Sequence, residues 1–150
     1  MKLTLQGETP SKKNSRIFNT KTKRSFPNKR YMEWHNAVVS QLQLLLLQKQ
    51  IRTFSDCRIK MTVTFYHGDM KRRDSDNQLS SILDTLVDAG IIEDDNWKVI
   101  PVKLILDDYD KGNPRVELEI EEIPSFSSKL INQLKSFFRI FNERETEENA

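Results

Sequence analysis

Apolar and polar side chains alternate most regularly over residues 57–66. A period of two is typical of a strand with one buried face, so this stretch predicts a half-buried strand. The side chains on its apolar side are Ile59, Met61, Val63 and Phe65. Shorter runs predict three further strands at 2–6, 98–106 and 115–121, and residues 16–26 predict a hairpin or an extended arm.

The longest stretch with the period of an α-helix begins at Asn28 and continues to about Gln50. Its apolar stripe consists of Tyr31, Trp34, Val38, Leu42, Leu45 and Leu46. Leu44 and Leu47 lie off this stripe, and apolar side chains beyond one stripe need a second surface. The end of this helix is therefore either buried on all sides or packed against a partner subunit.

Two shorter amphipathic helices are predicted at 77–89, with Gly90 in the C-cap position, and at 126–141, before an acidic tail at 143–150. The full order is strand, hairpin, helix, strand, helix, strand, strand, helix. This order predicts an α/β or α+β fold, in which helices pack on a mixed β-sheet.

The composition is that of one soluble domain. The chain has 150 residues, of which 37% are hydrophobic and 31% charged, enough to bury a core. No apolar run approaches the roughly 20 residues of a membrane span, and the polar N-terminus does not resemble a secretory signal. The single cysteine, Cys57, excludes an intrachain disulfide framework and a cysteine-based zinc site. We therefore expect a cytoplasmic protein without membrane contact.

Positive and negative charges are separated along the chain. Residues 1–73 contain sixteen Lys and Arg but four Asp and Glu, whereas residues 74–150 contain eight and eighteen. This asymmetry favours a surface that faces nucleic acid over a merely solvated hairpin. The predicted DNA contacts are Lys12, Lys13, Arg16, Lys21, Lys23, Arg24, Lys29 and Arg30. The interleaved Phe18, Phe26 and Tyr31 pack either inward or against a sugar–phosphate surface.

Acidic residues gather around the predicted helix at 77–89. The strand before the helix, its flank and the loop after it carry Asp74, Asp76, Asp84, Asp94 and Asp95. Carboxylates held together repel one another unless a cation lies among them, and Mg²⁺ prefers oxygen ligands of this kind. Such an ion activates water and stabilises the leaving oxygen during phosphodiester cleavage.

Two observations bear on this interpretation. Lys71, Arg72 and Arg73 directly precede the aspartates and would hold phosphates. Against a metal site, an aspartate at a helix N-cap stabilises the helix by about 1 kcal/mol without any ion. Spacing alone therefore leaves two interpretations open, a nuclease metal site and a solvated helix cap.

Three motifs closely resemble the RusA family of Holliday junction resolvases: Asp-Xaa-Asp-Asn at 74–77, Asp-Xaa-Leu at 84–86 and the Asp pair at 94–95. The loop at 10–14, Pro-Ser-Lys-Lys-Asn, also resembles the basic N-terminal loop of that family. The resemblance implies a homodimeric endonuclease that uses Mg²⁺, with Mn²⁺ as an alternative, and resolves four-way DNA junctions by paired nicks. It also implies a role in DNA recombination and repair and a phage or prophage origin.

Carried over position by position, the resemblance makes Asp74, Asp76 and Asp95 the catalytic, metal-binding aspartates, with Asp94 and Asp84 in support. It covers residues 1–122 as a RusA-like endonuclease domain and leaves 123–150 as a C-terminal amphipathic helix and acidic tail. That helix and the off-stripe leucines of the first helix are the candidate dimer surfaces.

One position departs from the family pattern. The family usually carries a lysine four residues after the second aspartate, where this chain has Ser80. A serine cannot neutralise a carboxylate or reach a phosphate as a cation. We hypothesise that Lys71, Arg72 or Arg73 supplies the missing charge.

The placement of Asp95 allows two arrangements. The helix at 77–89 carries the chain about 20 Å away from Asp76, and residues 90–95 span at most about the same distance. We favour a site within one subunit, because the strand after Asn96 can run back alongside. The alternative is an intertwined dimer, in which Asp94 or Asp95 of one subunit approaches Asp74 and Asp76 of the other.

Two other functions compete with the endonuclease. A non-catalytic or weakly active junction-binding protein on the same fold would explain the serine at position 80. A metal-dependent enzyme acting on nucleotides is less favoured, because a small substrate needs no such extended basic segment.

Overall fold

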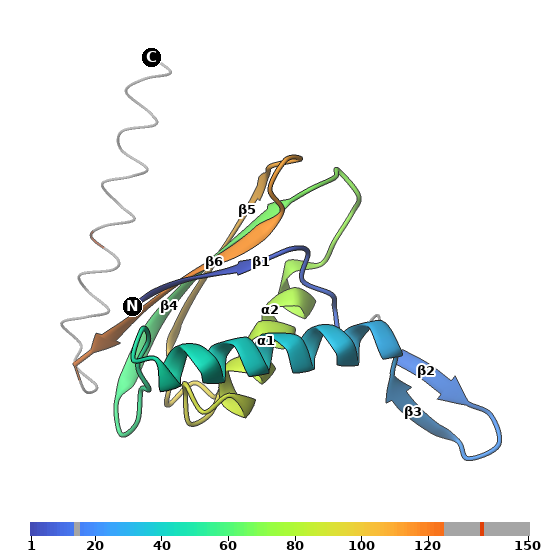
Figure 1. Cartoon of the computed structure of the whole chain (residues 1–150), viewed down its shortest axis with the longest axis horizontal. Helices are drawn as coiled ribbons and strands as arrows, with labels where there is room; N and C mark the ends of the chain where they lie inside the picture. The colour runs from blue at the N-terminus through green and yellow to red at the C-terminus, as the bar shows by residue number, and fades with distance from the viewer. Residues whose placement is uncertain (14–15, 125–135, 137–150) are drawn as a thin grey trace.

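Figure 1 presents a computed structural model of the chain, which describes residues 1–13, 16–124 and 136. In chain order the elements are β1 (Lys2–Gln6), β2 (Arg16–Asn19), β3 (Arg24–Pro27), α1 (Lys29–Leu47), β4 (Arg58–His67), α2 (Ser75–Asp88), β5 (Val102–Tyr109) and β6 (Arg115–Ile123). The predicted order of elements is confirmed as far as β6. The helix predicted at 126–141 and the acidic tail lie, apart from residue 136, outside the described residues.

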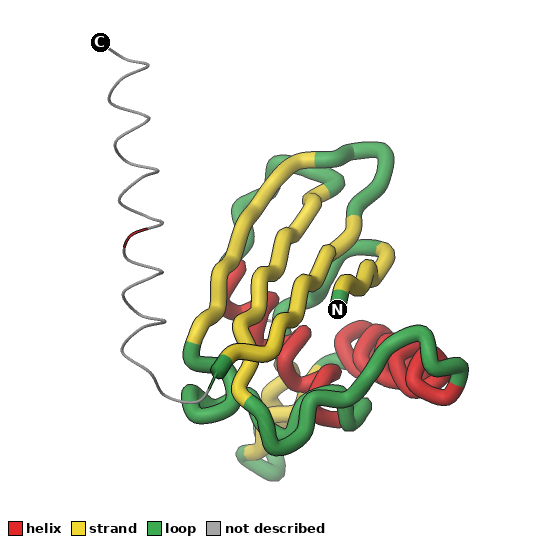
Figure 2. The backbone as a smooth tube through the Cα atoms, turned by 90° about the vertical axis from the view of Figure 1, so that its left-hand side faces the viewer, coloured by secondary structure: helices red, strands yellow, loops and turns green. Residues whose placement is uncertain are grey.

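Four strands form one sheet in the order β1-β6-β4-β5, and β2 and β3 form a separate hairpin. β4 and β5 run parallel, whereas β6 is antiparallel to both β1 and β4. The sheet is therefore mixed, as predicted. The helices pack on one of its faces (Figure 2). The β4 side chains buried against them are Ile59, Met61, Val63 and Phe65, and the whole is a single α+β domain.

α1 begins as predicted and ends slightly early. Asn28 is its N-cap, and the side-chain oxygen of this residue accepts a hydrogen bond from the Tyr31 N–H at 2.8 Å. The helix ends at Leu47, before Lys49, whose φ of 57° is incompatible with a continued helix.

The off-stripe leucines of α1 are exposed. Leu44 is 53% and Leu47 is 81% accessible, so the prediction that this helix end is buried on all sides is wrong within one protomer. The stripe residues lie inward to different extents, and Val38 and Leu42 are fully in the core. A partner subunit over the exposed leucines stays a prediction.

α2 buries the face that its periodicity predicted, with Leu79, Ile82, Leu83 and Leu86 in the core. It begins at Ser75, two residues before the predicted start, with Asp74 in the N-cap position. After its end, Gly90 adopts a φ of 75°, as the predicted C-cap glycine requires.

β5 differs most from its prediction, which placed the strand at 98–106. It begins only at Val102, because the preceding residues form a turn in which the Asn96 carbonyl accepts two backbone hydrogen bonds. At its other end it stays paired with β4 as far as Tyr109. No helix in the described part of the chain combines the length and apolar character that a bilayer span requires.

Candidate active site

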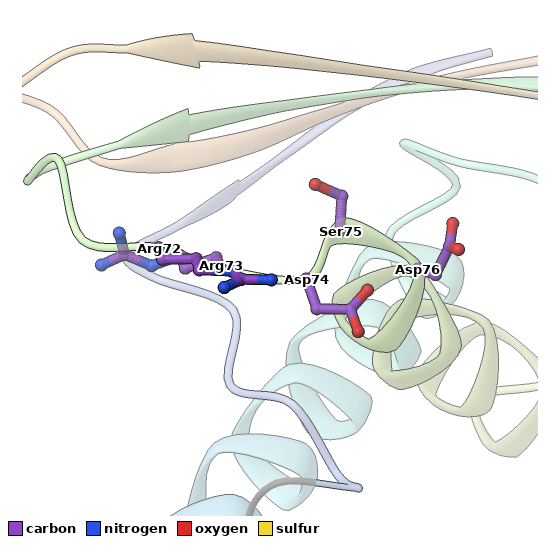
Figure 3. A pocket seen from close by; sticks show the side chains of 5 residues that line it. All are labelled: Arg72, Arg73, Asp74, Ser75 and Asp76. Atoms are coloured by element: carbon purple, nitrogen blue, oxygen red, sulfur yellow. The ribbon is translucent and has the colours of Figure 1, made fainter.

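Asp74 and Asp76 project from the first turn of α2 (Figure 3). Asp74 occupies the N-cap position, but its side chain makes no capping hydrogen bond to the helix backbone. Its carboxylate instead accepts a hydrogen bond from the side-chain amide of Asn77. Both aspartates are exposed. The helix-cap interpretation therefore fails for the Asp74 side chain, because its carboxylate is not used to satisfy the helix terminus.

These carboxylates border an open hollow of about 550 Å³, which is lined by Arg72, Arg73, Asp74, Ser75 and Asp76. A second hollow of about 410 Å³ shares three of those residues and adds residues 8–11, Arg30 and Lys71. The two hollows are therefore neighbours. Together their linings place Arg30, Lys71, Arg72 and Arg73 near Asp74, an arrangement that suits a polyanion.

A hydrogen-bonded chain behind the hollow holds the first turn of α2 in place. The Ser75 hydroxyl donates to Asp107 Oδ2 at 2.7 Å, and Asp107 Oδ1 lies 2.9 Å from His67 Nε2. The other ring nitrogen of His67 lies 3.5 Å from Glu8, whose second oxygen accepts the Gly68 N–H at 2.6 Å. The ends of β4 and β5 thereby orient the two aspartates.

The sequence analysis did not predict this series of hydrogen bonds. His67 and Asp107 come from β4 and β5, Glu8 comes from the loop after β1, and none belongs to a motif. One signal was available, because His67 and Asp107 lie at the carboxyl ends of neighbouring parallel strands, which meet at one edge of a sheet.

The early basic loop is fixed along α2. Gln78 donates to the Thr9 carbonyl at 2.7 Å, and the Lys12 N–H donates to the Ser81 hydroxyl at 3.0 Å. The Lys12 ammonium lies 2.6 Å from Asp84. Asp84 lies on the predicted helix flank, but in this protomer its carboxylate pairs with a lysine two turns from Asp76 rather than joining the acidic pair.

Tyr31 completes this contact, because its hydroxyl lies 3.5 Å from the Asp84 carboxylate. The tyrosine is 1% exposed, and burial, together with the charge of Asp84, raises its pKa to about 12. Of the three aromatic residues interleaved with the predicted DNA contacts, Tyr31 therefore packs inward, while Phe18 and Phe26 are exposed.

The acidic pair Asp94–Asp95 lies at the start of the central strands. The Ile59 N–H donates to the Val99 carbonyl at 2.9 Å, which holds this loop beside the beginning of β4. Lys103 Nζ donates to the Asp95 carbonyl, also at 2.9 Å. The loop is thus fixed near the beginning of β5 and does not return along α2.

The first turn of α2 lies near the other end of β4, because Asp107 is the register partner of Phe65. A strand rises about 20 Å over the six residues from Ile59 to Phe65. Within one protomer, Asp95 therefore does not join the 74–76 pair, and the same-subunit site that we favoured is not formed. Among the described residues, no three His, Cys, Asp or Glu side chains are grouped so that they could hold a metal ion.

Comparison with protein families matches residues 7–121 to the family described as Endodeoxyribonuclease RusA. The chain belongs to the RusA family. Among curated proteins, a segment of 54 residues is 37% identical to the crossover junction endodeoxyribonuclease rusA of Enterobacteria phage HK97. That segment is 36% of this chain and 45% of the phage protein, so the chain matches less than half the length of this RusA relative.

At the position where the RusA pattern has a lysine, the Ser80 hydroxyl donates to the Asp76 carbonyl at 3.0 Å and adds no charge. The three suspected replacements differ. Arg73 contacts Asp69 at 2.7 Å and Glu8 at 3.4 Å, and Lys71 contacts Asp69 at 3.2 Å. The hydrogen bond from Arg73 holds the pKa of Asp69 well below its ordinary value.

Arg72 is different from its two neighbours. It is exposed and lines both hollows, and no hydrogen bond or ion pair joins it to the described part of this RusA-family chain. The sequence hypothesis did not distinguish Lys71, Arg72 and Arg73 as sources of the missing charge. Of these three residues, only Arg72 lacks a pairing with the described residues.

The other predicted DNA contacts lie in the loop before β2, on the hairpin and at the start of α1. Arg16 is partly engaged, because its guanidinium donates two hydrogen bonds to Ser25 at 2.8 Å. Lys29 lies 3.6 Å from Glu33, and Arg30 lines the second hollow. The remaining cations are exposed and have no ion pair with a described residue: Lys13, Lys21, Lys23 and Arg24.

Proposed function

We propose that this protein is a divalent-metal-dependent DNA endonuclease that resolves four-way junctions by paired, symmetric nicks during DNA recombination and repair. One observation carries the proposal. In a chain of the Endodeoxyribonuclease RusA family, the motif aspartates Asp74 and Asp76 border an open hollow, and the hollow beside it is lined by Arg30, Lys71, Arg72 and Arg73. The phage protein that matches part of this chain is named a crossover junction endodeoxyribonuclease.

The residues at the hollow fit a hard divalent cation. Mg²⁺ uses one or two carboxylates and completes its coordination with water and substrate phosphate, and Asp74 and Asp76 supply two exposed carboxylates. Mn²⁺ accepts the same oxygen ligands. When bound, such an ion would supply activation of the attacking water and stabilisation of the leaving oxygen.

The protein side chains would do the positioning. Arg72 would hold a phosphate next to the aspartates, since its guanidinium has no partner among the described residues and is suited to bidentate phosphate contacts. The Ser75–Asp107 hydrogen bond would keep the first turn of α2 fixed during the reaction. Lys13, Lys21, Lys23 and Arg24 would contact the DNA backbone further from the cut.

We further propose a homodimer with shared sites. Symmetric cleavage of two strands requires two equivalent sites, which an isologous dimer provides. Within one protomer, the loop that carries Asp95 and the first turn of α2, which carries Asp74, lie at opposite ends of β4, about 20 Å apart. We therefore propose that the third carboxylate of each metal site comes from Asp95 of the other subunit. Leu44 and Leu47 are candidate contacts between the subunits.

A cleavage assay tests the activity. The protein is incubated with a synthetic four-way junction or a linear duplex, in Mg²⁺, Mn²⁺ or EDTA. We expect symmetric nicks in the junction that require the metal. Asp76→Asn should lower the cleavage rate by at least about a hundredfold. Removing a residue that only orients a metal ligand already lowers activity by up to about a hundredfold, and Asp76 is proposed as a ligand itself. Asp108→Asn, at an exposed aspartate of β5 that lines neither hollow, is the matched control.

Ser80 favours a second candidate, a junction-binding protein without turnover. Its hydroxyl is bonded to the helix backbone and provides no cation beside Asp76. Tight binding to the junction without cleavage in either metal would refute the endonuclease and support this candidate.

A further inference from the structure

The β2–β3 hairpin extends beyond the start of α1, away from the four-stranded sheet (Figure 1). Its two strands pair with each other and with no strand of the main sheet. A two-stranded hairpin is only marginally stable in water, yet this one exposes large apolar side chains. Ile17 is 59%, Phe18 61% and Phe26 48% accessible. These side chains lack a covering surface among the described residues.

The apolar side chains lie on both faces of the hairpin. Ile17 is the register partner of Phe26, so these two share one face, and Phe18 lies opposite Ser25 on the other. Arg16 holds that second face together through its two hydrogen bonds to Ser25. Docking on one flat protein surface would cover only one of these faces. A partner that surrounds the hairpin, or into which the hairpin inserts as a wedge, contacts both faces.

The charges around the hairpin indicate what this occupant is. No Asp or Glu occurs between Glu8 and Glu33, whereas eight Lys and Arg do. A second hairpin of the same kind would be repelled, and an apolar protein surface would leave these charges unpaired. A nucleic acid provides both complements, because its phosphates attract the cations and its bases stack on aromatic rings.

We propose that the hairpin inserts at the branch point of a DNA junction, where Phe18 stacks on a base that the branch leaves unstacked, while Lys21, Lys23 and Arg24 hold the flanking phosphates. Apolar wedges that enter between bases are a known means of recognising distorted DNA. This inference deepens the proposed function, and it rests on a junction being the substrate. It assigns the hairpin the choice of branched over linear DNA.

Binding without cleavage tests the inference. Affinities for a four-way junction and for a linear duplex of the same length are measured in EDTA for wild type and Phe18→Ala. Stacking on one base is worth at least about fivefold in affinity, so Phe18→Ala should weaken junction binding by that factor or more. Duplex binding should be unchanged. Phe18→Tyr should retain the junction preference, and Thr20→Ala, in the exposed turn of the same hairpin, is the matched control.

A fluorescent base gives a second readout. With 2-aminopurine at the branch, wild type should change the emission on binding, and Phe18→Ala at saturating concentration should not. Equal losses on junction and duplex would overturn the inference in favour of ordinary groove or backbone contact. A drop in the molecular mass of Phe18→Ala in the absence of DNA would overturn it in favour of docking on a second copy of the chain.

The two proposals fail separately. If wild type binds the junction through Phe18 but cuts nothing in Mg²⁺ or Mn²⁺, the endonuclease is refuted and the hairpin inference stands. If wild type cuts the junction and Phe18→Ala binds and cuts it equally well, the hairpin inference is refuted and the endonuclease stands.

Discussion

Two pairs of aspartates flank α2, and they are used differently. At the start of the helix, the Asp74–Asp76 pair borders an open hollow, and the Asp74 side chain caps nothing. Beyond the end of the helix, Asp94 holds its own loop, because its carboxylate accepts hydrogen bonds from the Asp95 N–H at 2.6 Å and from Asn96. The first pair is available to a ligand, whereas Asp94 is largely satisfied already.

This contrast shows that a carboxylate motif does not by itself form a site. Both pairs belong to the motifs that resemble the RusA family, yet they lie at opposite ends of the central strands. The site that we propose, with members of both pairs, therefore draws on a second subunit. Mutations that change one pair and not the other therefore test whether the two pairs have different roles.

The largest expected effect separates Asp95 from Asp94. Asp95→Asn should lower metal-dependent cleavage as much as Asp76→Asn, by at least about a hundredfold. Asp94→Asn removes a group that shapes the loop and should cost less, on the order of tenfold. Steady-state rates on the junction in Mg²⁺ measure both. Nearly normal cleavage by Asp95→Asn would mean that the second pair takes no part in the chemistry.

Mixing two inactive variants tests whether the pairs meet between subunits. In a heterodimer of Asp76→Asn and Asp95→Asn, the shared arrangement leaves one intact site, whereas a same-subunit arrangement leaves none. Random mixing should therefore restore about a quarter of the wild-type sites. Each heterodimer should nick one strand rather than two, which sequencing gels resolve. Activity that stays at background would support sites built from one subunit.

A smaller effect concerns the cation beside the first pair. Arg72→Ala should lower the cleavage rate about tenfold, since a hydrogen bond to a charged group is worth roughly 1.5–3 kcal/mol. Lys71→Ala, whose ammonium is already paired with Asp69, is the matched control and should lose less. Ser80→Lys should restore activity to Arg72→Ala and change wild type little. A large gain in wild type would mean that nothing had replaced the family lysine.

Local patterns predicted most of the fold. The alternation of β4 and the apolar face of α2 each depend on packing against one common core, so their periods appear in the sequence. The start of β5 was misplaced because a turn at Asn96 competes with the strand. Its apolar residues gave no sign of that turn.

The candidate site was predictable only in part. The motif identified Asp74 and Asp76, but the reach of a loop gives a maximum distance and no direction, so Asp95 was placed on the wrong side. The choice of Arg72 over Arg73 depends on the two partners of Arg73, which are Asp69, four residues before it, and Glu8, far away in sequence. The pairing with Glu8 arises from tertiary structure and leaves no local pattern.

The smallest expected effect is on thermal stability at acidic pH, and it concerns Asp94 of the second pair. Hydrogen bonds from Asn96 and from the Asp95 backbone lower the pKa of Asp94. A lowered pKa in the folded state stabilises the fold above the ordinary aspartate pKa of about 3.9, and this stabilisation is lost as the pH falls through the folded-state pKa. The Tm difference between wild type and Asp94→Asn should therefore shrink from pH 7 to pH 3.

Asn96→Ala sharpens this measurement, because the Asn96 side chain makes the largest contribution to the shift. Its own Tm should depend less on pH in the acidic range than that of wild type. Since the 94–96 turn is distant from the hollow at Asp74, acidification should weaken the loop without moving the first pair. A Tm difference that stays constant down to pH 3 would mean that the Asp94 carboxylate does not stabilise the loop through its charge.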